Sequence, residues 1–143
     1  TLYLNEDNKV FNKVTDLQKN VESTMIFSEK YGFDKRNWII MSTEIDNKAK
    51  VAREQINTYK SMLKKYEPIR EKNELIGKIS TNLFRMNEFV TACELWSQYI
   101  NTLGAHDNGK TELDRVADSL IDLKKSDDNL RSFIQLYKKR NSL

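Results

Sequence analysis

The stretch that decides the fold runs from Trp38 to Tyr66, WIIMSTEIDNKAKVAREQINTYKSMLKKY. Its apolar residues recur at steps of three and four, at Trp38, Met41, Ile45, Ala49, Ala52, Ile56, Tyr59, Leu63 and Tyr66. Such steps place one side chain per turn on the same face of an α-helix, whereas a strand would require steps of two. The segment is therefore predicted to be one long amphipathic helix.

Apolar residues recur at the same steps of three and four on both sides of this stretch. After an extended lead-in over residues 1–7, helices are expected over about 8–31, 35–66, 69–103 and 111–140. Gly32 is typical of a helix C-terminus, because glycine adopts the left-handed conformation without strain. Asp34 can cap the next helix, and Pro68 disfavours helical backbone at the residue before it. These positions mark the expected boundaries.

The segment from Gly104 to Lys110 is the clearest loop, since it contains the turn formers Asp, Asn and Gly in succession. Thr111 and Asp114 resemble a capping box at the start of the last helix. In that helix Asp127 falls on the apolar stripe. Either Asp127 is a polar inclusion in one long helix, or a break near Ser126 begins a short fifth helix.

The predicted architecture is all-α: a single domain over residues 1–143, folded as an elongated up-down-up-down four-helix bundle. Four glycines and one proline in 143 residues argue against an all-β fold, whose many turns need them. A composition of 38% hydrophobic and 31% charged residues suits a thin bundle. In the alternative, Pro68 only kinks one long rod, which would form a membrane-surface dimer.

The residue inventory argues against an enzyme. The only histidine, His106, falls in the predicted loop, and the only cysteine, Cys93, falls in an apolar helical run. A zinc site would need more thiols or histidines than one each, and the nucleophile elbow typical of a Ser-His-Asp hydrolase is absent from the sequence. No glycine-rich phosphate loop is present. We therefore expect a non-enzymatic protein with no catalytic residue, metal or cofactor, in which Cys93 is a small buried hydrophobe.

Neither a membrane span nor a signal peptide is expected. The sequence has no run of about 18 apolar residues, which a transmembrane helix would need. Residues 1–7 lack the basic start and the apolar core of a signal peptide. A cytoplasmic location is the resulting expectation.

Positive charge is concentrated in the middle of the chain. Residues 47–86 contain ten basic side chains and four acidic ones. An up-down bundle would gather part of this charge at the end that holds both termini. The candidate contacts for a polyanion, either a nucleic acid or an anionic membrane, are Lys60, Lys64, Lys65, Arg70 and Lys72. Alternatively, these cations only offset helix dipoles.

The opposite end is predicted to be aromatic and apolar, with the two tryptophans at the same end. The candidate protein interface is Trp38, Ile39, Ile40, Leu95, Trp96 and Tyr99. Helices that are apolar on all sides are either central in a core or covered by a partner. The leading hypothesis is an interaction module for another protein or a second copy. It predicts that at least two of Ile39, Ile40, Leu95, Trp96 and Tyr99 are partly exposed.

Overall fold

Four helices make up almost all of the part of the chain that the structure describes, residues 2–31, 35–63, 70–103 and 109–140 of a computed structural model. They are α1 (Leu2–Tyr31), α2 (Lys35–Leu63), α3 (Arg70–Leu103) and α4 (Lys110–Arg140). No strand occurs among these residues. The prediction of an all-α, four-helix up-down bundle is thus confirmed.

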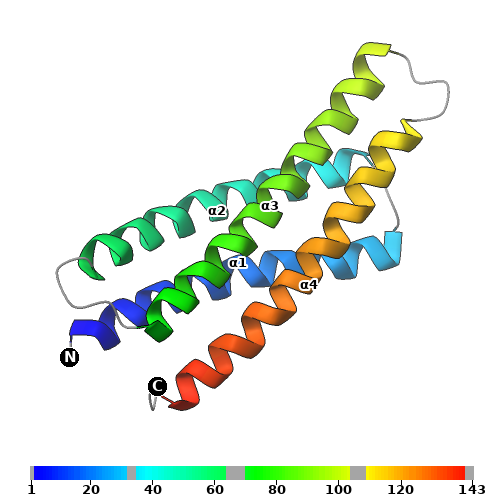
Figure 1. Cartoon of the computed structure of the whole chain (residues 1–143). Helices are drawn as coiled ribbons and strands as arrows, with labels where there is room; N and C mark the ends of the chain where they lie inside the picture. Colours follow the sequence, from blue (N-terminus) through cyan, green and yellow to red (C-terminus); the bar gives the residue numbers. More distant parts are fainter. Residues whose placement is uncertain (1, 32–34, 64–69, 104–108, 141–143) are drawn as a thin grey trace.

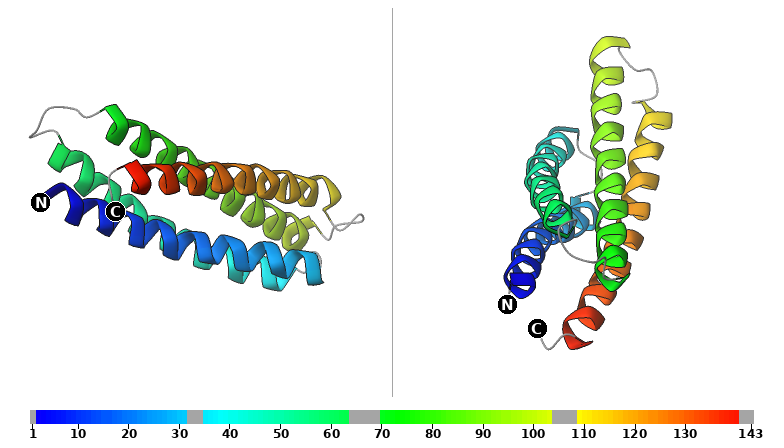
Figure 2. Two further views of the ribbon diagram at one scale, coloured as in Figure 1. Left: turned by 90° about the horizontal axis from the view of Figure 1, so that it is seen from below. Right: turned by 60° about the vertical axis from the view of Figure 1, so that its left-hand side comes forward.

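The bundle is built from two helical hairpins (Figure 1). The closest pairings are of α1 with α2, α2 with α3, and α3 with α4, while α1 and α4 meet over a smaller area. The hairpin of α3 and α4 crosses the hairpin of α1 and α2 at an angle, as Figure 2 shows. As a result, the last turns of α3 and the first turns of α4 project beyond the other two helices. We call this part the projecting end.

The apolar stripe that predicted the fold lies in the core. In α2 the stripe from Trp38 to Tyr59 is buried apart from Met41, which is half-buried. The other helices contribute matching stripes, which include Val14 and Leu17 of α1, Ile79 and Met86 of α3, and Leu123 and Leu130 of α4. Burial of these side chains away from water is the main favourable contribution to folding.

The expected extended lead-in over residues 1–7 is wrong, because α1 already begins at Leu2. Asp7 interrupted the apolar pattern in the sequence, yet it occupies a stripe position. The buried series Asp7, Val10, Val14, Leu17 and Val21 advances by three and four residues. A carboxylate therefore stands where the pattern would otherwise show an apolar side chain.

Helix α4 runs without a break from Lys110 to Arg140. The alternative with a short fifth helix after Ser126 is therefore wrong, and Asp127 is a buried polar inclusion in one helix. The capping box is also wrong, because Thr111 lies inside the helix. Gly109 precedes the first residue of α4, and its carbonyl oxygen accepts the backbone N–H of Leu113 at 2.8 Å.

The kinked-rod alternative is contradicted by the packing of α2 against α3, since one continuous rod would separate these two segments. Pro68 itself lies outside the described residues, as do Gly32, Asp34, His106 and the expected loop up to residue 108. The predictions made for those positions fall in the same undescribed segments. Helix α2 is described to Leu63, three residues short of its expected end.

Candidate interaction surfaces and a buried polar cluster

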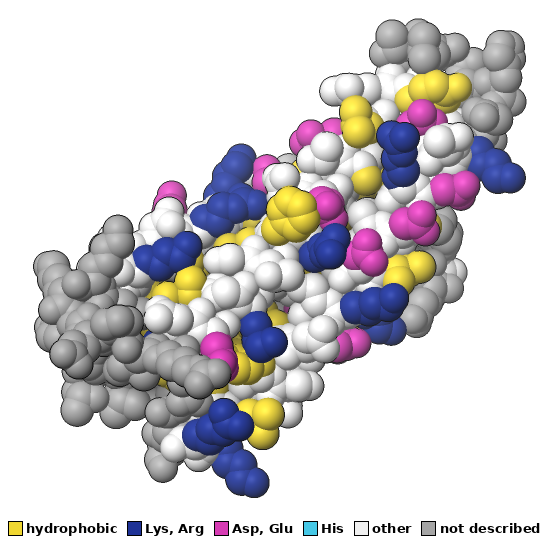
Figure 3. Space-filling view, viewed as in Figure 1, with side chains coloured by type: hydrophobic (Ala, Val, Ile, Leu, Met, Phe, Trp, Pro, Cys, Tyr) yellow, Lys and Arg dark blue, Asp and Glu magenta, His cyan; other side chains and the backbone are white. Residues whose placement is uncertain are grey.

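Two aliphatic side chains are strongly exposed near the projecting end. Ile40 of α2 is 53% exposed and Leu95 of α3 is 44% exposed. Ile39 and Tyr99 are partly exposed beside them in the sequence. This confirms the prediction that at least two of the five candidates would be partly exposed. We refer to Ile39 and Ile40, near the start of α2, and Leu95 and Tyr99, toward the end of α3, as the apolar end surface. Apolar side chains are also visible on the projecting end in Figure 3.

The two tryptophans of the candidate interface belong to the core instead. Trp38 is 0% exposed and Trp96 is 3% exposed. The ring of Trp38 meets Phe89 edge-on, with 5.7 Å between the ring centroids. Because Phe89 lies two turns before Trp96 in α3, both indoles occupy the same half of the bundle, as predicted. Their contribution is therefore to stability, since neither presents its ring to a partner.

Gly109 anchors the start of α4 on α3. Its φ angle is 66°, a left-handed conformation that favours glycine. A Cβ atom at this position would lie 3.0 Å from Cδ1 of Tyr99 and 3.1 Å from Cδ1 of Trp96. The absence of a side chain at Gly109 therefore lets the backbone pack directly on the two aromatic rings and fixes the shape of the projecting end.

A groove of about 260 Å³ lies between α1 and α4. Its apolar lining residues, Val21, Met25 and Ile26, come from α1, and its charged ones are Glu22, Lys124, Asp127, Asp128 and Arg131. Ile26 is largely exposed, and so is Ile121, which lies two turns before Asp128 on the same ridge of α4. The sequence pattern did not single out either isoleucine. Each follows a stripe residue directly, so the only sequence signal was an apolar residue beside the stripe.

At the opposite end, each helix contributes one polar side chain to a buried cluster. Asp7, Tyr59, Lys72 and Tyr137 come from α1, α2, α3 and α4 in turn. The Lys72 ammonium lies 3.0 and 2.8 Å from the two carboxylate oxygens of Asp7 and donates to the Tyr137 hydroxyl at 2.8 Å. Tyr59 and Tyr137 each donate a hydroxyl hydrogen bond to Asp7.

The charges and hydroxyls of the cluster are paired with one another. Burial raises the pKa of Tyr59 well above its usual value, and its hydrogen bond to the Asp7 carboxylate acts in the same direction. The tyrosine therefore stays protonated and remains a donor. A buried polar network of this kind fixes the register of the elements that build it. Its evident contribution here is to align all four helices.

The buried cluster changes the candidate polyanion site. Lys72 was expected at the surface, but it is buried and its charge is neutralised by Asp7. Among the other candidates, Lys60 is exposed on α2. Lys64 and Lys65 lie outside the described residues, and Arg70 begins α3 with a side chain that the structure does not describe. The structure thus removes one of the five residues from the predicted basic surface.

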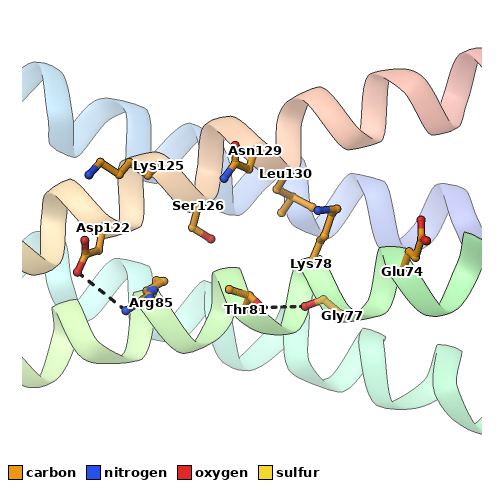
Figure 4. A pocket seen from close by; sticks show the side chains of 10 residues that line it. All are labelled: Glu74, Gly77, Lys78, Thr81, Arg85, Asp122, Lys125, Ser126, Asn129 and Leu130. Carbon is orange, nitrogen blue, oxygen red and sulfur yellow. Dashed lines mark hydrogen bonds and ion pairs between the residues drawn. The ribbon is translucent and has the colours of Figure 1, made fainter.

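A groove of about 740 Å³ follows the joint between α3 and α4 (Figure 4). It is lined by Glu74, Gly77, Lys78, Thr81, Arg85, Asp122, Lys125, Ser126, Asn129 and Leu130. Arg85 pairs with Glu88 at 3.0 Å and lies 3.9 Å from Asp122. The Thr81 hydroxyl donates to the carbonyl of Gly77 at 3.0 Å. Both signs of charge line this groove.

The thiol of Cys93 is not placed for nucleophilic chemistry. The side chain is buried, as expected, and burial raises the pKa of the thiol to about 12. Burial also raises the pKa of Asp127, although Arg131 at 3.0 Å opposes this shift. Within the described segments, no group of three histidine, cysteine or carboxylate side chains could hold a metal ion.

Comparison of the chain with protein-family models, with curated proteins and with solved structures found no match. None of the four described helices combines the length and the apolar character that crossing a membrane requires. The features that bear on function are therefore the surfaces and grooves of the bundle itself.

Proposed function

We propose that the chain is a non-enzymatic helical interaction module that binds another protein, or a second copy of itself, through the apolar end surface. The observation that carries the proposal is the exposure of Ile40 and Leu95 close to the projecting end. Leu95 lies toward the end of α3, whose last turns extend beyond α1 and α2, whereas Ile40 lies near the start of α2.

The energetic argument concerns apolar surface that stays exposed after the core at this end has formed. The core at this end is already closed by Trp38, Phe89 and Trp96, all of which are buried. Ile40 and Leu95 add little to that core. Covering such side chains is favourable by about 25 cal/mol per Å² of apolar surface removed from water. A single exposed aliphatic residue is ordinary, but several at one end of a bundle are typical of an interface.

Association is the first measurement that tests the proposal. Sedimentation equilibrium over a wide concentration range should show that the wild-type chain self-associates, or that it binds a protein recovered from its source cells and then purified. We expect the double variant Ile40→Ser, Leu95→Ser to weaken that association at least tenfold. Loss of two interface anchors commonly has an effect of this size.

The control is Leu136→Ser. Leu136 is 51% exposed, like the test residues, but lies in α4 close to its C-terminal end. This variant should associate as the wild type does. Equal association of the wild type and the double variant would contradict the proposal, and so would an equal loss in the Leu136→Ser variant.

The kinked-rod dimer is not proposed, because α2 and α3 pack against one another. The prediction that a nucleic acid binds at the predicted basic end is weakened, because Lys72 is buried. A groove between α2 and α3, which includes Lys60 but not Lys72, is better suited to a nucleic acid.

A further inference from the structure

A groove of about 440 Å³ lies between α2 and α3, on a different part of the surface from the apolar end surface. Ile56 and Leu83 form its floor, since both are buried. The polar and aromatic lining residues are Arg53, Asn57, Lys60, Ser80, Phe84 and Asn87. None of the eight lining residues is acidic. Basic and apolar side chains are visible side by side where α2 and α3 meet (Figure 3).

Phe84 is the unusual residue of this groove. It is 56% exposed, although it lies in the middle of α3 and phenylalanine is usually buried. The guanidinium of Arg85 lies 5.8 Å from the centroid of the Phe84 ring. A planar ring held beside a guanidinium group offers a stacking platform for a flat ligand.

Cations from the neighbouring helix face the same groove. Arg53 and Lys60 of α2 line it and make no ion pair within the described segments, whereas Lys50, Arg85 and Arg131 each pair with a carboxylate. Arg53 and Lys60 are seven residues apart, which is roughly 10 Å along a helix axis. Asn57 and Asn87 add side-chain amides that can donate and accept hydrogen bonds.

We propose that this α2–α3 groove binds single-stranded nucleic acid. An unpaired base would stack on Phe84, and the phosphates that follow it would contact Arg53 and Lys60. Single-strand sites combine these elements: a basic track for the backbone and an aromatic ring for a base. A duplex keeps its bases stacked on one another, so it could use the two cations but not Phe84. This inference is independent of the proposed protein interface.

The test uses the full chain and fluorescence anisotropy with a labelled oligouridylate of about 12 nucleotides, a length within known single-strand site sizes. At low salt the wild type should bind this probe more tightly than a duplex of the same length. Phe84→Ala should weaken binding by about 5- to 150-fold, the effect expected when one stacked base is lost. Phe84→Trp should preserve it.

The cations are tested through salt dependence. The double variant Arg53→Gln, Lys60→Gln should reduce the slope of log affinity against log salt by about 1.4, since each single-strand phosphate contact contributes about 0.7. The matched control is Lys13→Gln, Lys19→Gln, which removes two exposed charges from α1. The control should change the slope much less, because those lysines lie outside the groove.

The proposal is overturned if the probe does not bind at low salt, if duplex binds as tightly as single strand, if Phe84→Ala has no effect, or if only anionic vesicles bind. Binding of uridine monophosphate is measured as a further comparison. If it binds as tightly as the oligonucleotide, the groove is a nucleotide pocket and the proposed strand track is wrong. The Ile40→Ser, Leu95→Ser variant should retain oligonucleotide binding, which separates this test from that of the protein interface.

Discussion

Lys72 illustrates at the scale of one residue how the fold determines what a side chain can do. In the sequence it is one of several lysines near the middle of the chain. In the structure its ammonium lies 2.8 Å from an Asp7 oxygen and 2.8 Å from the Tyr137 hydroxyl. Its partners are 65 residues away in both directions. A charge pattern read along one chain carries no information about pairing over such a distance.

We predict that Lys72→Met destabilises the fold by about 3–5 kcal/mol, because it leaves the buried Asp7 carboxylate without its counter-charge. Adding Asp7→Asn should restore part of the loss, since the amide oxygen can still accept from the tyrosines. Urea unfolding measures both variants. The exposed Lys60→Met is the control. If Lys72→Met stays within about 0.5 kcal/mol of the wild type, as surface substitutions do, the cluster does not stabilise the bundle.

Two glycines provide a matched pair of predictions at the same scale. Gly109→Ala should destabilise by at least about 1–2 kcal/mol, because it combines a left-handed backbone with close contacts to Tyr99 and Trp96. Gly77→Ala should instead stabilise by about 0.5–1 kcal/mol, since Gly77 lies within α3 and an added Cβ atom would meet nothing within 4 Å. The midpoint temperatures of thermal unfolding of the two variants should shift in opposite directions from that of the wild type. Shifts of the same sign would contradict this description of the start of α4.

At the scale of elements, the periodicity of apolar residues predicted the four helices and most of their bounds. The starts of α2 and α4 lie within one residue of expectation. Two of the errors share one physical cause, which is a polar residue on the buried face. Because Asp7 is polar, the first two turns of α1 were not predicted to be helical. Asp127 suggested a break in α4 that does not exist. The periodicity of apolar residues reveals the buried face of a helix only where the buried side chains are themselves apolar.

The candidate surfaces were predicted less well than the helices. The sequence located the apolar end, because Trp38 and Trp96 had to share one end of an antiparallel pair. The apolar stripe separated Trp38 from Ile40, but it could not separate the exposed Leu95 from the buried Trp96, since this depends on how the two hairpins cross. The groove with Phe84 and Lys60 was missed for a related reason. These residues are 24 positions apart and meet only when α2 packs on α3.

At the scale of the whole molecule, the crossing of the two hairpins separates three regions. The polar cluster of Asp7 and Lys72 closes one end, the basic groove lies along the joint of α2 and α3, and the apolar end surface occupies the other end. The central claim is that Ile40 and Leu95 are surplus to folding and available to a partner. A surface residue and a core residue respond differently to truncation, so the claim can be tested on the isolated chain.

The most direct measurement is the free energy of unfolding, obtained by urea titration at low protein concentration. It compares two variants: the double variant Ile40→Ser, Leu95→Ser and the single variant Trp96→Ala. We predict that the double variant stays within about 1 kcal/mol of the wild type, because each surface change is worth about 0.5 kcal/mol or less. Trp96→Ala should lose about 3–5 kcal/mol, since Trp96 is buried. A loss in the double variant as large as that of Trp96→Ala would show that Ile40 and Leu95 belong to the core, and it would contradict the central claim.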